Sequence, residues 1–209
     1  DWEAPSFKIV GQGMPPMVDA GFDFYAPQSF EDVAGRRLMI GWSGCPDATA
    51  EDPTVARGWQ CALTVPRELS MRDGKLCQQP AHEIERMRGD CVRTTGGETV
   101  EEPGRLFDLV VSCEGAKMVE LEIRKGVFVR YADGMLTLDM GDEGYGRDQR
   151  SIELSELRDL RVLSDTTMVE IFANGGEAAL TSRTYSPAVP AMELHDEGAA
   201  SMNFYRLVH

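Results

Sequence analysis

The fold of this chain is decided by two consecutive runs of sequence, Gly21-Phe22-Asp23-Phe24-Tyr25-Ala26-Pro27-Gln28-Ser29-Phe30 and Gly35-Arg36-Arg37-Leu38-Met39-Ile40-Gly41-Trp42. Their aromatic and branched residues predict two short strands, over 24–30 and 37–42. A packed core strand would be mostly aliphatic, whereas these runs mix rings with an acid, an amide and two arginines. A carbohydrate needs flat rings for its apolar faces and hydrogen-bonding groups for its hydroxyls. We therefore expect a sugar-facing surface here.

The composition narrows the class of partner. The 209 residues are 42% hydrophobic and carry a formal charge of -14, from 35 acids against 21 bases. This charge makes attraction to nucleic acid or to anionic lipid improbable, so a neutral partner is expected. No run of about 18 apolar residues occurs, which predicts a soluble chain. No nucleic-acid or membrane partner is expected.

The start of the chain and its cysteines predict whether it is part of a longer protein and in which compartment it acts. The chain starts at Asp1-Trp2-Glu3, which reads as the middle of an element, so we expect it to be a piece of something longer. Five cysteines without a C-x-x-C spacing argue against a zinc site and against a secreted disulfide scaffold. Free thiols in a cytoplasmic protein are the expectation, and no metal or cofactor is expected.

Turn signals divide the chain into two all-β units. Short strands are predicted up to residue 80, including 62–65 and 75–78, with the tight turn Asp73-Gly74 joining these two. Residues 81–88 are expected to be a short helix or an irregular connector, and 94–98 a polar, flexible segment. We place the first unit at 1–80, a connector at 81–101 and a β-sandwich at 102–209.

Clean alternation in the second unit predicts half-buried antiparallel strands. Val119, Leu121 and Ile123 are expected to face inward, with Glu120, Glu122 and Arg124 facing outward. The pattern recurs over 127–131 and 169–173, and Asn174-Gly175 is a strong hairpin signal. Several strands at this spacing indicate a sandwich.

Four strings of residues together resemble glycoside hydrolase family 32, which contains invertases, sucrose-6-phosphate hydrolases, levanases and inulinases. They are Asp23 to Phe30, Gly35 to Trp42, Gly58-Trp59 with Leu63 to Leu69, and Val169 to Glu177 with Thr181-Ser182-Arg183. The resemblance implies the closing part of a five-bladed β-propeller followed by a β-sandwich, with the other blades outside this chain. It also implies retaining hydrolysis of fructosides by two carboxylates.

The resemblance implies no catalytic residue in this chain. The family carries its carboxylates on Trp-Met-Asn-Asp-Pro-Asn, Arg-Asp-Pro and Glu-Cys tracts, and none of these occurs in the sequence. The sequence around Glu3 is similar to the Glu-Cys tract that carries the family's acid/base. However, alanine stands in place of the cysteine, and only twenty positions separate Glu3 from Asp23. The 209-residue chain alone is therefore predicted to be inactive.

The resemblance places Tyr25 and Trp42 beside the fructose pocket, and Asp23 is the third candidate for substrate binding. Asp23 could equally cap a turn or join two blades. Gln28, Arg36 and Arg37 are expected to make ion pairs or backbone contacts. A serine nucleophile at Ser43 is disfavoured because the glycine of a nucleophile elbow is lacking, and His82, His195 and His209 have no partner motif. The acids at 133, 139, 142 and 143 are interpreted as solvated loop residues rather than a calcium site.

Three functions remain open. The chain is part of a β-fructosidase acting on sucrose, its phosphate or fructo-oligosaccharides, or its sandwich is a carbohydrate-binding module, or it has a structural role with a homodimer contact. The second option has little support because the outward residues of the predicted strands at 119–131 are charged rather than aromatic.

Overall fold

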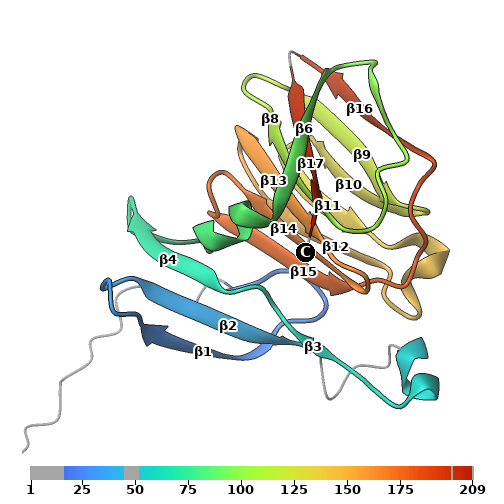
Figure 1. The fold of residues 1–209 in the computed structure, drawn as a ribbon. Helices are drawn as coiled ribbons and strands as arrows, with labels where there is room; N and C mark the ends of the chain where they lie inside the picture. The colour runs from blue at the N-terminus through green and yellow to red at the C-terminus, as the bar shows by residue number, and fades with distance from the viewer. Residues whose placement is uncertain (1–16, 45–51, 199, 209) are drawn as a thin grey trace, which may run out of the picture.

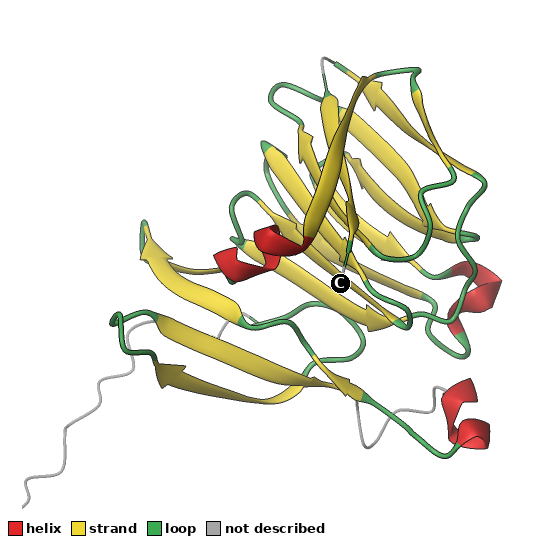
Figure 2. Cartoon of the chain, viewed as in Figure 1, coloured by secondary structure: helices red, strands yellow, loops and turns green. Residues whose placement is uncertain are grey.

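The computed structural model describes residues 17–44, 52–198 and 200–208, and this part of the chain is all-β (Figures 1 and 2). Three sheets contain its strands, and neighbouring strands within each sheet run antiparallel. In the described ranges, no helix is both long and apolar enough to cross a membrane. The helical elements of the described part are three short 3-10 turns, namely η1 (Pro53–Arg57), η2 (His82–Met87) and η3 (Gly141–Gly144).

The N-terminal strands form a five-stranded sheet. Its order is β1 (Tyr25–Glu31), β2 (Arg37–Ser43), β4 (Arg67–Arg72) and β5 (Lys75–Pro80), with β3 (Ala62–Leu63) paired to β2. The strands predicted at 24–30 and 37–42 are therefore confirmed. All seven residues of β1 are exposed, and β1 is an edge strand.

The Asp73-Gly74 turn is confirmed, but the strand that leads into it was predicted wrongly. Both turn residues have positive φ, 49° and 77°, and Arg72 pairs with Lys75 across a two-residue loop. The strand before the turn is β4, not the predicted 62–65, of which only Ala62–Leu63 is strand. The sequence of β4, Arg67-Glu68-Leu69-Ser70-Met71-Arg72, gives no apolar alternation, which is why its pattern was missed.

Two six-stranded sheets form the rest of the described chain, called here the two-sheet unit (Figure 1). The first has the order β12 (Gln149–Glu153), β11 (Met135–Asp139), β10 (Val127–Ala132), β9 (Met118–Arg124), β16 (Ala191–Glu197) and β7 (Thr99–Glu101). The second has the order β15 (Ala178–Arg183), β14 (Met168–Ala173), β13 (Asp159–Ser164), β8 (Phe107–Ser112), β17 (Ser201–Leu207) and β6 (Arg88–Thr95).

One hydrophobic core fills the space between these two sheets. Leu121 and Ile123 of the first sheet belong to the same buried cluster as Leu109, Val162 and Ile171 of the second. Each such side chain contributes about 1.5 to 3 kcal/mol when fully buried, so this layer supplies most of the driving force for folding.

Three sequence expectations for the two-sheet unit can be compared with the structure. The Asn174-Gly175 hairpin is confirmed, with a loop over 174–177 between β14 and β15. The outward direction predicted for Arg124 is wrong, because this side chain is fully buried and donates through Nε to Ser164. The pairing register of β10 with β9 shifts between Val127, which lies opposite Arg124, and Phe128. This irregularity breaks the inward–outward alternation at Arg124. Residues 88–95 and 99–101, assigned to the connector from sequence, form β6 and β7.

The segment over residues 19–23 joins the five-stranded sheet to the two-sheet unit. Backbone amides of Ala20 and Phe22 donate to the carbonyls of Ala179 and Thr181 on the edge strand β15. Gly21 allows this approach, because a Cβ at that position would lie 2.1 Å from the Thr181 carbonyl oxygen. The segment therefore covers an edge that would otherwise expose unpaired backbone groups.

Candidate functional site

An exposed aromatic pair stands where the sequence predicted a sugar-facing surface. Tyr25 at the start of β1 pairs with Trp42 near the end of β2, and the two ring centroids are 5.9 Å apart with an interplanar angle of 70°. Tyr25 is 49% exposed and Trp42 is half-buried. Edge-to-face packing keeps the two rings in a fixed relation and leaves part of each open to a ligand.

A bulge in β1 sets the direction of Tyr25. The pairing register shifts between Tyr25 and Gln28, and Ala26 has a positive φ of 43°. A non-glycine residue in this region of φ is uncommon and is held there by its surroundings. Bulges redirect side chains at the margins of sheets, so this one separates Tyr25 from the regular part of the strand.

The aromatic pair is tied to the two-sheet unit through Phe24. Gly41 leaves room for its ring, since a Cβ on Gly41 would lie 2.4 Å from it. The Arg67 guanidinium lies 4.6 Å from the centre of the Phe24 ring and 5.0 Å from that of Phe172 on β14. Arg67 therefore joins the strand that carries Tyr25 to a strand of the other unit.

Arg67 is also the centre of a buried charge cluster. Its Nη2 lies 2.7 Å from Glu170 and its Nη1 3.0 Å from Asp19, and all three side chains are 0–1% exposed. Nη1 also donates to Gln78 at 2.7 Å. Burial raises the pKa of Glu170, while the Arg67 charge acts in the opposite direction. Glu170 in turn accepts a hydrogen bond from the Val65 amide, so the cluster fixes the path of the chain after β3.

Asp23 does not lie on the same exposed face as the aromatic pair. Its carboxylate is 1% exposed and accepts hydrogen bonds from Arg147 at 2.7 and 2.9 Å and from the Arg183 amide at 2.8 Å. Arg147 follows η3 in the two-sheet unit and also donates to Asp52 at 3.0 Å. The structure thus brings Tyr25 and Trp42 together and places Asp23 in a second cluster that joins the two units.

A hydrogen-bonded tyrosine completes this second cluster. Tyr185 donates to Asp52 at 2.7 Å, and its ring packs edge-on against Tyr145. Burial acts to raise the pKa of Asp52, but the hydrogen bonds from Tyr185 and Arg147 outweigh it and hold that pKa below its ordinary value. Asp52, at the start of η1, is thus held as an ionised carboxylate.

The other residues weighed from sequence fall outside the aromatic pair. Ser43 is fully buried, and His195 lies 3.7 Å from Glu193 on the exposed side of β16. Arg37 is an exposed partner of Glu31 at 3.7 Å. Glu3 and His209 lie outside the described residues. Of the described cysteines, Cys77 and Cys113 are buried, Cys61 is half-buried and Cys91 is exposed, and all four are free.

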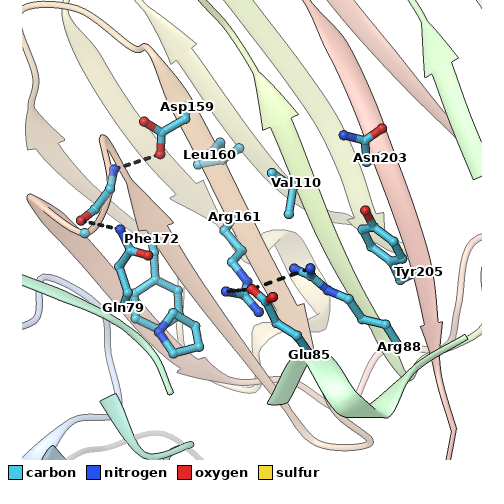
Figure 3. A pocket seen from close by; sticks show the side chains of 13 residues that line it. Gln79, Glu85, Arg88, Val110, Asp159, Leu160, Arg161, Phe172, Asn203 and Tyr205 are labelled. Atoms are coloured by element: carbon cyan, nitrogen blue, oxygen red, sulfur yellow. Dashed lines mark hydrogen bonds and ion pairs between the residues drawn. The ribbon is translucent and has the colours of Figure 1, made fainter. Parts of the chain in front are cut away.

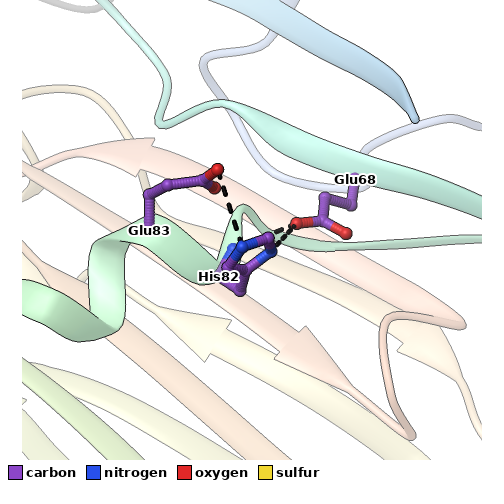
Figure 4. A group of neighbouring side chains, drawn as sticks. All are labelled: Glu68, His82 and Glu83. Carbon is purple, nitrogen blue, oxygen red and sulfur yellow. Dashed lines mark hydrogen bonds and ion pairs between the residues drawn. The ribbon is translucent and has the colours of Figure 1, made fainter. Parts of the chain in front are cut away.

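Within the described residues, one group of side chains has the spacing of a metal site, and an arginine already occupies it. Ligand atoms of Glu68, His82 and Glu83 lie within 4.8 Å of one another (Figure 4). Arg36 bonds all three, at 2.7 Å to each glutamate and 2.8 Å to His82 Nδ1, and also pairs with Asp32. The hydrogen bond from Arg36 lowers the pKa of Glu83 to about 2. Arg36 is thus structural, as expected from sequence, and the acids at 133, 139, 142 and 143, interpreted from sequence as solvated loop residues, are not in this group.

Comparisons with known proteins agree with this architecture. Residues 1–80 match the model of the glycosyl hydrolases family 32 N-terminal domain, and residues 127–207 match that of the family 32 C-terminal domain. The chain belongs to glycoside hydrolase family 32.

Two curated relatives support the same family assignment. The chain is 34% identical over 198 residues to the sucrose-6-phosphate hydrolase of Salmonella typhimurium and 37% identical over 206 residues to the raffinose invertase of Escherichia coli. Each match covers 90% of this chain but only 39% and 42% of the relative. The chain therefore spans about two fifths of the length of these curated relatives.

Solved structures show the same fold at lower identity. The sucrose-6-phosphate hydrolase of Lactobacillus gasseri superposes with a TM-score of 0.76 at 22% identity, covering 91% of this chain and 42% of that one. A Bombyx mori β-fructofuranosidase mutant in complex with sucrose also superposes with a TM-score of 0.76, at 21% identity, and the match covers 93% of this chain and 42% of that one.

Sequence reasoning missed the residues that join the two units. Arg67, Glu170 and Arg183 all lie inside the strings that carried the family resemblance, yet no role was assigned to them. A signal was present, because Glu170 interrupts the apolar run Val169-Ile171-Phe172, and a charge in a buried strand needs a partner. Arg147 gave no such signal, since it lies in a polar loop.

Proposed function

We propose that this chain is the C-terminal part of a retaining β-fructofuranosidase. In this proposal the five-stranded sheet, within residues 1–80, is the closing part of a five-bladed β-propeller. Residues 102–209 form its C-terminal β-sandwich, and 81–101 connect the two while contributing edge strands. Membership of family 32 and the exposed edge of β1, where a neighbouring blade would lie, support this assignment.

Tyr25 and Trp42 form one wall of the fructoside pocket in this proposal. The observation that carries it is a half-open aromatic pair held on a strand that two buried ion clusters fix to the sandwich. The indole ring offers an apolar face to the sugar, and the phenol donates a hydrogen bond to a hydroxyl or a carboxylate. Asp23 contributes by positioning this strand, because Arg147 and Arg183 already occupy its carboxylate.

The catalytic carboxylates belong to the part of the protein outside these 209 residues. Retaining hydrolysis needs one carboxylate as nucleophile and a second as acid and base. The buried acids described near the aromatic strand, Asp19, Asp23 and Glu170, all pair with arginines and are not poised for either role. The whole protein is proposed to act on sucrose, sucrose 6-phosphate or fructo-oligosaccharides, as the names of its relatives suggest. Its free thiols fit a cytoplasmic location.

Ligand-detected NMR tests the role of the pair directly. Saturation transfer from the chain to the fructosyl protons of sucrose is expected, with little transfer to maltose as a matched disaccharide. Trp42→Ala should reduce the transfer, because the stacking surface is lost, while Trp59→Ala serves as a matched control on an exposed tryptophan. Equal transfer in the wild type and in Trp42→Ala would contradict the proposal.

A structural role is the second candidate, supported by the same open edge. The seven exposed residues of β1 present unpaired backbone groups, which favour pairing with another chain or blade. The partner in the whole protein is proposed to be the remaining propeller, and in the isolated chain a second copy.

A further inference from the structure

A pocket away from the aromatic pair lies on the outer face of the sheet that contains β13, β8 and β17. Its cavity volume is about 280 Å³, and its wall is built by both units (Figure 3). Gln79 at the end of β5 closes one side, Asp159 and Arg161 come from β13, and Asn203 and Tyr205 come from β17. None of these residues belongs to the Tyr25–Trp42 pair.

Both arginines in the wall of this pocket are paired with carboxylates. Arg161 forms a two-point ion pair with the fully buried Asp108, at 2.9 and 2.7 Å, and Arg88 bonds the same carboxylate at 2.7 Å. Glu85 lies 3.4 Å from Arg161 and 3.5 Å from Arg88. Two guanidinium groups thus face two carboxylates, and Asp159 adds a third acid. A phosphate or other anion finds no uncompensated cation here.

The ion pairs also hold the wall of the pocket rigid. The Arg88 guanidinium lies 4.4 Å from the centre of the Tyr205 ring, so the ring cannot rotate away without breaking this contact. Such fixed side chains lose little conformational entropy when a ligand binds. The pocket therefore has a preformed aromatic element.

Polar atoms around this ring have unused hydrogen-bonding capacity. Asn203 accepts from Arg93 Nε at 3.0 Å through Oδ1, and its NH₂ group has no partner among the described residues. Gln79 donates to the Gly175 carbonyl at 2.9 Å, which leaves its own oxygen without a donor in the described structure. Asp159 accepts from the Gly175 amide at 2.7 Å through one oxygen only. The wall thus offers one unused donor, on Asn203, and unused acceptor oxygens, on Gln79 and Asp159.

We propose that this pocket binds one or two units of a neutral oligosaccharide. The paired arginines and the additional acid disfavour anions, and a fixed ring beside a free donor and free acceptors suits sugar hydroxyls. The volume, at the small end of ligand pockets, limits the bound part to a short stretch of chain. That the chain is built from fructose rests on the proposed function. The charged outer faces of β9 and β10 belong to the other sheet, so they do not bear on this site.

The test is calorimetry on the 209-residue chain with three probes. We use a fructose-based tetrasaccharide of the inulin type, maltotetraose as a glucose-based probe of equal length, and inorganic phosphate. Saturable binding of a neutral probe without binding of phosphate is expected. Binding of maltotetraose but not of the fructose chain would support the pocket and contradict the fructoside assignment, so the two proposals can fail separately.

Variants locate the bound probe. Asn203→Asp keeps an oxygen that accepts from Arg93 but replaces the NH₂ donor by a second carboxylate oxygen and adds a negative charge, and Gln79→Ala removes the acceptor. Each should weaken binding about fivefold, the loss of about one hydrogen bond, and the double variant about 25-fold. Gln149→Ala, on the exposed edge strand β12, is the matched control and should change affinity less than about twofold.

Two outcomes overturn the proposal. Trp42→Ala removes any sugar held at the aromatic pair and should leave the binding that depends on Asn203, so a loss of all binding in Trp42→Ala with none in Asn203→Asp assigns the sugar to the aromatic pair instead. Absence of heat with both neutral probes, in a chain whose thermal unfolding shows it folded, rejects the site. The thermal midpoint of each variant is measured first, so that an unfolded variant is not counted as one that fails to bind.

Discussion

Replacing Arg67 by methionine should destabilise the chain strongly, because it leaves two buried carboxylates without their cation. Glu170 and Asp19 are 0–1% exposed and lie 2.7 and 3.0 Å from Arg67 nitrogens. Unit charges about 4 Å apart attract by about 4 kcal/mol at an effective dielectric constant of about 20. Removing one member of a buried pair typically costs about 3 to 5 kcal/mol. For a chain of this size, a loss of about 4 kcal/mol lowers Tm by about 8 to 16 °C.

The stability that Arg67→Met loses relative to the wild type should also depend on pH. Burial raises the pKa of Glu170 above its ordinary value of 4.5, and Arg67 restrains that rise. A carboxyl whose pKa is higher in the folded state contributes stability at low pH and loses it as the pH rises through the folded value. Without Arg67 the pKa of folded Glu170 rises further, so the variant continues to lose stability up to a higher pH than the wild type does. The deficit of Arg67→Met relative to wild type should therefore be smaller at pH 5 than at pH 8.

Urea unfolding at pH 5 and pH 8, monitored by tryptophan fluorescence, measures this difference in the free energy of unfolding. Arg37→Met on β2 is the matched control, because its partner Glu31 is exposed at 3.7 Å, and it should change stability by less than about 0.5 kcal/mol. Arg67→Met with Glu170→Leu should recover part of the loss, since the unpaired charge at Glu170 is gone. A deficit below about 1 kcal/mol, or one that is equal at both pH values, would refute the reasoning.

Three further outcomes follow from close contacts, thiol burial and the open edge. Gly21→Ala should destabilise by about 1 to 3 kcal/mol in urea unfolding, because the new Cβ meets the Thr181 backbone, and an unchanged midpoint would contradict the docking contact. At pH 8, iodoacetamide followed by mass spectrometry should modify Cys91 rapidly and Cys113 only on unfolding, since burial raises the pKa of Cys113 to about 12. The chain should self-associate in light scattering, and Phe30→Lys on β1 should reduce this, whereas a monodisperse wild type at high concentration would remove the expectation.

Local patterns predicted much of the fold. The Asp73-Gly74 turn follows from the positive φ that a two-residue hairpin requires, and the structure has it. The alternation over 119–123 predicted the inward residues of β9 correctly, because one face of that strand lies on the core. Tyr25 and Trp42 meet because antiparallel pairing of two adjacent short strands brings the start of one opposite the end of the next.

Contacts between distant segments could not be predicted in this way. Arg67 and Glu170 are 103 positions apart, and Asp23 and Arg147 are 124 apart. A charged residue in a strand pattern is compatible with an outward position, as was predicted for Arg124, until the partner is known. The burial of these arginines depends on how the two units dock, which no periodicity encodes. Edge strands such as β6 are also hard to recognise, because their exposed residues lack an apolar face.

Hydrolysis of sucrose by the isolated 209-residue chain tests the central claim most directly. The claim is that the chain supplies a wall of a fructoside pocket while the reacting carboxylates lie elsewhere in the protein. Release of glucose and fructose is followed over a day, with a complete family 32 invertase as the positive control. We predict release no faster than in a blank without protein. Clear turnover, at a rate approaching that of the control enzyme, would show that the catalytic carboxylates are within this chain and would contradict the account.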